Sequence, residues 1–515
     1  MIINKNSLIE PNKTIFLSVL LTIIGSAVFI FLANYIDFHP DESIYYDAIP
    51  ISLRKDVGLF YSLYYTFFVD YLGGVRGARV ASALLGGGSL FFILLSIRFI
   101  GGGIFWLGFT ALAFILSYQS IFIFDRVRPE AAWWFLSTVM IYGLLAIEVK
   151  SSWFNAIIVM LVAITLPMNH QVSWFACLYS VGYILAFSRL KIGVIKSLVL
   201  VSSIALGVIL NIIIRADILS IDPMPALATL LAGTGGGASQ SIVDYFHLVF
   251  VGSPLFLNDT AVYPNLFGLI GFESRWATHA YIQTLFWLLM FALPFVAKSW
   301  RVRYAISFPL FAFILFYITG YYNPTYSAGF SLFSLLVAIF LAVNSSFRVK
   351  TIVILIGLFS ILNGISFITT RILNHGEASF YIVEQKLKDI LNERPTLQKV
   401  AVPERFLSLS RNKKFTRYSD FKDRLPKDLD LLVYDDYDYQ MYGFVPNFSE
   451  VSEELIERAK SMCLLTQMKY PVYIGDKLFP AQKQNEPYAS DSKAGSWFFR
   501  NSVNYTIYVF EACRK

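Results

Sequence analysis

The stretch Thr14–Ile36, TIFLSVLLTIIGSAVFIFLANYI, decides the class of fold. It contains no charged residue, and it is long enough for an α-helix to cross a membrane, which takes roughly 20 apolar residues. The apolar core of a secretory signal peptide is shorter, at about 7–15 residues. Because runs of the same texture recur down the chain, we interpret Thr14–Ile36 as a retained membrane span.

The composition of the whole chain excludes an ordinary soluble protein. Hydrophobic residues make up 56% of the 515 residues and charged residues only 15%. Soluble domains carry about a quarter charged residues, so this chain has too few charges to cover a surface that faces water. The 47 phenylalanines and 30 tyrosines suit lipid contact and the aromatic belts of a membrane interface. The composition therefore indicates a polytopic α-helical membrane protein.

The apolar runs predict about eleven transmembrane helices. They lie at 14–36, 78–100, 104–124, 131–148, 153–168, 172–187, 194–214, 281–297, 303–321, 327–344 and 350–371.

Basic residues predict which way the chain crosses the membrane, because cytoplasmic loops are enriched in Lys and Arg. With a cytoplasmic N-terminus, the inner segments contain only Glu10 and Glu148 as acidic residues. Their basic residues are Lys5, Lys13, Arg98, Lys150, Arg189, Lys191, Lys196, Lys298, Arg301, Arg303, Arg348 and Lys350. The net charge of +7 thus reflects topology and requires no nucleic-acid partner. An odd number of spans places residues 372–515 outside the cytoplasm.

Residues 372–515 differ in amino-acid composition from the membrane part. Acidic and basic residues are nearly balanced there, and no run is long enough to span. A helical stretch near 450–462 alternates with β-rich segments, which predicts a small α/β domain. These segments are Asp430–Tyr434, Val472–Ile474 and Tyr505–Phe510. Cys463 and Cys513 could form a disulfide in an oxidising compartment.

The predicted organisation is thus a membrane domain, residues 1–371, followed by an extracytoplasmic domain, residues 372–515. The membrane domain has two large outer loops, 37–77 and 215–280. Within the first loop, the aromatic pattern of Leu53–Val69 predicts a helix that lies along the membrane surface.

The first group of candidate site residues follows the first span. The chain reads Asp37-Phe38-His39-Pro40-Asp41-Glu42-Ser43-Ile44-Tyr45-Tyr46-Asp47. Pro40 can begin a helix whose first turn carries Asp41 and Glu42. Negative charge at a helix N-terminus is favourable in itself, so a solvated, capped interfacial helix is one interpretation. The other is a catalytic site at the outer mouth of the helix.

A second group lies at the same membrane boundary, after the third predicted span: Asp125-Arg126-Val127-Arg128-Pro129-Glu130. Two carboxylates and two guanidiniums are costly at this depth unless they are paired or face a polar cavity. Arginine stems can extend to the interface, so a surface salt bridge is one interpretation. Because both acidic groups face the same compartment, they could instead converge on one pocket.

The His-Pro-Asp-Glu run at His39–Glu42, the Asp125–Glu130 site, the many spans and the outer C-terminal domain resemble the GT-C glycosyltransferases. The sequence is most similar to family 39-like enzymes, which include protein mannosyltransferases and aminoarabinose transferases. This resemblance implies transfer of a sugar from a polyprenyl phosphate to a lipid, glycan or protein acceptor, usually with inversion. It also favours a bacterial inner membrane, with a periplasmic tail and membrane lipids around the spans, whereas an endoplasmic reticulum membrane would place the same tail in the lumen.

The resemblance also implies roles for individual residues. Asp41, with Glu42 beside it, corresponds to the acid that acts as general base or positions the acceptor. Asp125 corresponds to the acid of the second loop, with Arg128 and Glu130 near the site. One departure is that Thr325 stands where relatives carry a basic residue near the lipid phosphate.

Other cations could therefore stabilise the departing phosphate. The candidates on the outer side are Arg126, Arg128, Arg275 and His279. Arg275 and His279 also fit an interfacial belt with Trp276. A divalent cation could bridge carboxylates and phosphate, although no spacing in the chain demands one.

We therefore predict a GT-C membrane glycosyltransferase, with two alternatives. A polymerase or ligase of polyprenyl-linked glycans usually has catalytic basic residues in a large central loop and lacks an outer C-terminal domain. A transporter or lipid flippase predicts charges within the spans or internal symmetry, and neither is clear in this sequence.

Overall fold

The computed structural model describes residues 11–34, 42, 46, 49, 59–149, 151–169, 173–232, 295, 303–304, 307, 311, 335–336, 338–340, 342–374, 380–397, 399–402, 415–417, 429–435, 457–470 and 505–513. The chain divides into two compact units. The first comprises residues 1–33, 48–259 and 265–367, and the second comprises residues 34–47, 260–264 and 368–515.

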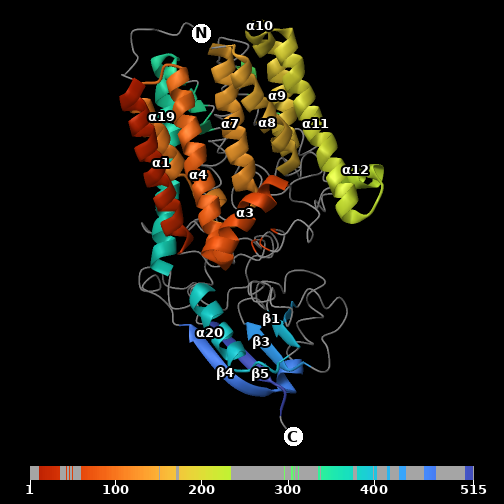
Figure 1. The fold of residues 1–515 in the computed structure, drawn as a ribbon. Coiled ribbons are helices and arrows are strands. Elements are labelled where there is room, and N and C mark those ends of the chain that lie inside the picture. Colours follow the sequence, from red (N-terminus) through yellow and green to blue (C-terminus); the bar gives the residue numbers. More distant parts are fainter. Residues whose placement is uncertain are drawn as a thin grey trace. The chain divides into compact units, whose positions relative to one another are not determined.

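In the described part of the first unit, long helices lie side by side (Figure 1). Helix α1 packs on α4, α4 on α7, α7 on α8, and α8 on α11. The described helices of this part are α1 Pro11–Ala33, α3 Leu59–Leu72, α4 Gly74–Phe99, α5 Ile104–Ile115, α6 Tyr118–Phe124, α7 Pro129–Val149, α8 Trp153–Asn169, α9 Ser173–Tyr183, α10 Arg189–Ile192, α11 Val194–Leu219, α12 Pro223–Ala232 and α19 Phe347–Asn374.

Four helices in the described part of the chain are long and apolar enough to cross a membrane: Ile15–Ala33, Gly74–Phe99, Pro129–Val149 and Val194–Asp217. They coincide with the predicted spans at 14–36, 78–100, 131–148 and 194–214. The predicted spans at 153–168 and 350–371 are helical, as α8 and α19. The predicted spans at 281–297, 303–321 and 327–344 lie largely outside the described residues.

The prediction of one continuous helix over 104–124 is wrong. Helix α5 ends at Ile115, and after Leu116 and Ser117 a separate helix, α6, begins at Tyr118. Ser117 adopts an extended conformation and caps α6, because its side-chain oxygen accepts a hydrogen bond from the backbone N–H of Ser120 at 3.3 Å. Neither Gly nor Pro marks this break, which is why the apolar pattern reads as one element.

The predicted helix over 172–187 is also interrupted. Helix α9 ends at Tyr183, and Ile184–Ser188 forms a turn of π-helix before α10. Ser188 then donates a hydrogen bond to Glu148 Oε1 on α7, at 2.7 Å. The wider turn therefore places a polar contact between two apolar helices.

Glycines on α4 allow its neighbours to approach closely. A Cβ atom at Gly86 would lie 2.7 Å from Phe124 and 2.9 Å from Phe29, and one at Gly88 would lie 2.8 Å from Phe135. The rings of Phe29 and Phe124 are 5.5 Å apart, so α1, α4 and the end of α6 form one packed cluster. Small residues permit this kind of close helix packing. The cluster fixes the end of α6 immediately before Asp125.

Helix α3 corresponds to the predicted surface helix at Leu53–Val69, although residues 51–58 lie outside the described part. One side of α3 is fully buried through Tyr61 and Tyr65, and α3 packs on α4. Phe67 and Tyr71 are 55% and 76% exposed. The aromatic residues of this helix are therefore divided between the protein core and the outer surface.

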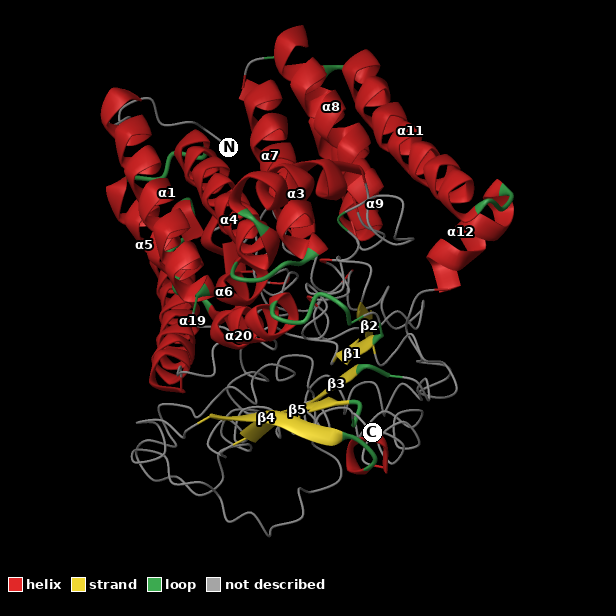
Figure 2. Ribbon diagram, turned by 60° about the horizontal axis from the view of Figure 1, so that its bottom comes forward, coloured by secondary structure: helices red, strands yellow, loops and turns green. Residues whose placement is uncertain are grey.

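The second unit contains a five-stranded mixed sheet, shown in yellow in Figure 2, with strand order β2-β1-β3-β5-β4. Strand β1 pairs in parallel with β2 and with β3, whereas β5 pairs antiparallel with β3 and with β4. The elements are α20 Phe380–Asn392, β1 Val400–Val402, β2 Phe415–Arg417, β3 Leu431–Asp435, β4 Cys463–Tyr470 and β5 Tyr505–Glu511.

Strands β3 and β5 agree with the predicted strands at 430–434 and 505–510. The predicted strand at 472–474 lies outside the described residues. A disulfide joins Cys463, the first residue of β4, to Cys513, just after β5. This bond ties together the ends of the two strands that pair antiparallel.

Candidate functional site

The segment Asp125–Glu130 lies between α6 and α7 and is buried throughout. Its four charged side chains are 0% exposed at Asp125, 4% at Arg126, 1% at Arg128 and 4% at Glu130. The structure thus brings together all the candidate site residues predicted from the second loop. They lie in the helical unit, where most buried side chains are apolar.

Local sequence explains why the chain turns here. Asp125 ends α6, with its backbone N–H donating to Ile121 O at 3.0 Å. Pro129 then begins α7, a position where its missing N–H costs no helical hydrogen bond. Glu130 lies in the first turn of α7, where a negative charge is favoured by the helix dipole.

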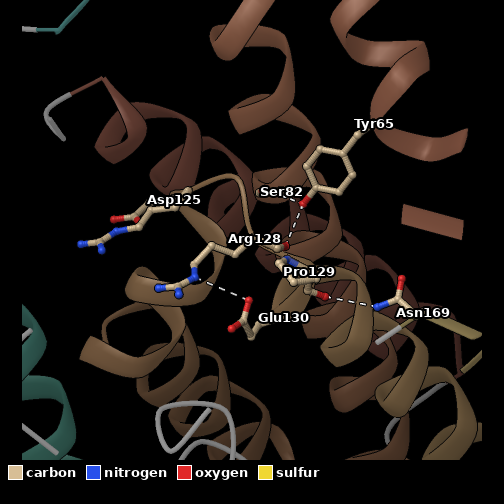
Figure 3. Close-up of polar contacts among 8 residues, drawn as sticks. Tyr65, Ser82, Asp125, Arg128, Pro129, Glu130 and Asn169 are labelled. Carbon is tan, nitrogen blue, oxygen red and sulfur yellow. Dashed lines mark hydrogen bonds and ion pairs between the residues drawn. The ribbon is translucent and has the colours of Figure 1, made fainter. Parts of the chain in front are cut away.

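The charged side chains pair locally. Arg126 Nε lies 3.5 Å from Asp125 Oδ1, and Arg128 Nε lies 3.5 Å from Glu130 Oε2. Figure 3 shows the second pair as a dashed line. Two carboxylates and two guanidiniums make the segment electrically neutral as a whole, which limits the cost of burying it.

The two arginines also share an aromatic neighbour. The guanidinium carbons of Arg126 and Arg128 lie 4.3 Å and 5.1 Å from the centre of the Phe122 ring. At these distances the electron-rich face of a ring attracts a cation. Phe122, on α6, therefore helps to hold two like charges near each other at one buried place.

Side chains from two other helices reach the backbone of the segment (Figure 3). The Tyr65 hydroxyl donates to Arg128 O at 3.3 Å, and it lies 2.6 Å from Ser82 Oγ on α4. Asn169 Nδ2, at the end of α8, donates to Pro129 O at 3.3 Å. Helices α3 and α8 therefore contact the segment that joins α6 to α7, and α4 contacts Tyr65 through Ser82.

Sequence reasoning missed Phe122, Tyr65 and Asn169. Phe122 lies inside an apolar run, and its role depends on which arginines fold over it. Tyr65 was one of several aromatic residues in the predicted surface helix. Asn169 precedes an outer turn, and that position was its only signal.

The remaining predicted site residues fall in other parts of the chain. Glu42 is fully buried in a helical conformation and belongs to the second unit. Asp41, His39, Arg275 and His279 lie outside the described residues, as does Thr325. Convergence of Glu42 or Asp41 on the Asp125 segment therefore stays a prediction.

Within the described residues, no three His, Cys, Asp or Glu side chains are grouped so that they could hold a metal ion. The divalent cation considered from the sequence stays a prediction, because the first acidic loop is mostly outside this part of the chain.

No protein-family model matches the chain, and no curated protein matches it. Among solved structures, it is similar to the crystal structure of ArnT from Cupriavidus metallidurans bound to undecaprenyl phosphate. The TM-score is 0.46 and the sequence identity 11%, over 83% of this chain and 94% of that one. At this TM-score the similarity assigns no activity, donor or acceptor to the chain.

Proposed function

We propose that this chain is a GT-C-type membrane glycosyltransferase that transfers a sugar from a polyprenyl-phosphate donor to an acceptor hydroxyl outside the cytoplasm. The observation that carries the proposal is the buried Asp125–Glu130 segment at the junction of α6 and α7. Ionisable side chains inside a bundle of membrane helices are expensive, and they mark functional sites by default.

The reaction needs a base for the acceptor. The acceptor oxygen attacks the anomeric carbon, the bond from that carbon to the phosphate oxygen breaks, and its electron pair leaves with the phosphate. A carboxylate within hydrogen-bond reach accepts the hydroxyl proton. Asp41, or Glu42 beside it, is the proposed base, and Asp125 is the proposed acid of the second loop. A single displacement from the opposite face inverts the anomeric configuration.

The leaving group needs positive charge. The polyprenyl phosphate gains negative charge as the sugar departs, and charge-assisted hydrogen bonds from arginine suit phosphate geometry. Arg126 and Arg128 are already dehydrated by burial and are held in place, so they need little reorganisation during the reaction. Arg275 and His279 are proposed as further contacts with the donor.

Sidedness supports a lipid-linked donor, because nucleotide sugars do not reach the outer compartment. The basic residues of the inner loops favour a cytoplasmic N-terminus. The Cys463–Cys513 disulfide suits an oxidising compartment such as the periplasm for residues 372–515. We place the protein in the bacterial inner membrane, with a lipid, glycan or protein as acceptor.

The test is sugar transfer by purified protein in lipid nanodiscs. A panel of radiolabelled polyprenyl-phosphate sugars is supplied with membrane extract as the source of acceptors. Asp125→Asn is compared with Asp217→Asn, which changes an exposed carboxylate near the end of α11. We expect acceptor-dependent transfer by wild type and by Asp217→Asn, and a loss of about 100-fold or more in Asp125→Asn.

Equal transfer by Asp125→Asn and wild type would remove Asp125 from the site. No transfer by wild type from any donor would overturn the proposal, and transport of the labelled lipid would then be measured.

A further inference from the structure

The geometry points to Tyr65 and Asn169 as positioning residues that hold the start of α7, so that the Arg128 guanidinium, paired with Glu130, is held toward the donor phosphate. This inference rests on the proposed function. It is argued from hydrogen bonds that two consecutive backbone carbonyl groups accept. Tyr65 donates to Arg128 O and Asn169 donates to Pro129 O, each at 3.3 Å and each from a different helix (Figure 3).

The start of α7 needs such support because its own backbone provides little. Pro129 has no N–H, and the first N–H groups of any helix have no partner within the helix. Arg128 O does accept from the backbone N–H of Ala131, at 3.3 Å. A carbonyl oxygen has two lone pairs, so the Tyr65 hydroxyl adds a second bond to the same atom.

Tyr65 is held rigidly enough to act as a brace, which here means a side chain that fixes the position of the α7 backbone through a hydrogen bond. Its side chain is fully buried, and its ring stacks on Tyr61 with 4.2 Å between ring centres. The hydroxyl has one hydrogen. If that hydrogen goes to Arg128 O, then Ser82 donates to the Tyr65 oxygen, 2.6 Å away. Helices α3 and α4 are thereby both tied to Arg128, whose guanidinium is the predicted phosphate-binding group.

Asn169 provides the matching brace from α8. It is the last residue of that helix and is fully buried. Because its amide donates to Pro129 O, the end of α8 is tied to the first residue of α7. Neither Tyr65 nor Asn169 reaches the charged groups of Arg128 or Glu130 in these contacts. They act through the backbone.

The expected effect is on catalysis rather than on folding. A displacement of about 1 Å at a reacting centre can cost 100-fold in rate. Tyr65→Phe and Asn169→Ala each remove one brace, so we expect kcat to fall about tenfold while the donor KM changes less than twofold. Both braces hold one segment, so the double variant should lose less than the product of the two single losses.

The chain offers a matched control for each variant. Tyr64, the neighbour of Tyr65 on α3, donates to Ala81 O at 3.1 Å, and burial raises the pKa of its hydroxyl. Asn211, on α11, donates from its side-chain amide to Pro167 O at 3.0 Å. Tyr64→Phe and Asn211→Ala thus remove a hydrogen bond of the same kind, but to a carbonyl outside the Asp125–Glu130 segment.

The experiment measures kcat, donor KM and thermal unfolding for wild type, the two brace variants, their double variant, the two controls and Asp125→Asn. The inference predicts a lower kcat in the brace variants than in their matched controls, with unfolding temperatures equal to those of the controls. It is overturned if Tyr65→Phe and Asn169→Ala keep the kcat of their controls while Asp125→Asn is inactive. It is also overturned if the loss of kcat in these variants is fully explained by a smaller fraction of folded protein. If wild type transfers no sugar, the proposed function fails, and the brace role falls with it.

Discussion

Arg128 and Glu130 show at the residue scale how a buried charge can be retained in an apolar bundle. Each is almost completely buried, and their closest charged atoms are 3.5 Å apart. Replacing a buried ion pair with apolar residues is often neutral, whereas removing one partner leaves an uncompensated charge. The pair is therefore weak evidence for stability and better evidence for function.

Removing only one member of this pair should destabilise the protein. We expect Glu130→Gln to lower the free energy of unfolding by about 3 kcal/mol, because Arg128 then stays buried without that carboxylate. The double variant Arg128→Met/Glu130→Met should recover most of this loss. Denaturation of the purified protein in detergent measures both. A double variant less stable than Glu130→Gln would contradict the reasoning.

At the residue scale, the sequence showed where charged residues lie but not which backbone groups Tyr65 and Asn169 contact. Asp125, Arg126, Arg128 and Glu130 interrupt an apolar sequence, so their position at a helix boundary was visible. The bonds from Tyr65 and Asn169 end on backbone carbonyls, which every residue has. No sequence pattern distinguishes the carbonyl that receives such a bond.

At the element scale, glycines on α4 determine how closely its neighbours pack. A methyl group at Gly86 would approach Phe124 and Phe29 to within 3.0 Å, and Phe124 immediately precedes Asp125. By contrast, a Cβ atom at Gly108 on α5 would meet nothing within 4 Å. The two positions therefore separate close packing from helix propensity.

We expect Gly86→Ala to lower the free energy of unfolding by about 1–3 kcal/mol, because the ring of Phe124 or the helix backbone must shift. Gly108→Ala should be neutral or stabilising by up to about 1 kcal/mol, since alanine favours helix more than glycine does. Thermal unfolding in one detergent compares the two. A more stable Gly86→Ala variant would show that this cluster is less tightly packed than described.

The long helices were predictable because apolar runs of about 20 residues have few alternatives to a membrane helix. Their interruptions were not. The break at Leu116 and Ser117 depends on a serine that caps α6, and serine also occurs inside the neighbouring helices. The π-turn at Ile184–Ser188 has an apolar sequence apart from Ser188, which contacts Glu148 through tertiary structure.

At the scale of the whole molecule, the distribution of charge along the chain predicts sidedness. The predicted inner loops are basic, and the disulfide between Cys463 and Cys513 lies in residues 372–515. Both features fit a tail outside the cytoplasm. In that tail, β3 and β5 were predictable from short β-rich segments, while β1 and β2 have only three residues each and gave no such signal.

Fusions at the C-terminus test this topology. We expect alkaline phosphatase fused after Lys515 to be active in a bacterial host, because that enzyme needs an oxidising compartment. A fusion after Lys150, in a predicted inner loop, should be inactive and serves as the control. Activity in the second fusion but not in the first would reverse the predicted orientation.

The central claim, that the protein transfers a sugar from a polyprenyl phosphate, is tested most directly by product stoichiometry. Purified wild-type protein in nanodiscs is given a defined donor and its acceptor, and both products are quantified by mass spectrometry. The account predicts one polyprenyl phosphate released for each glycosylated acceptor, with an inverted anomeric centre. Glycosylated acceptor without release of polyprenyl phosphate, or intact donor after incubation with every acceptor tested, would contradict it.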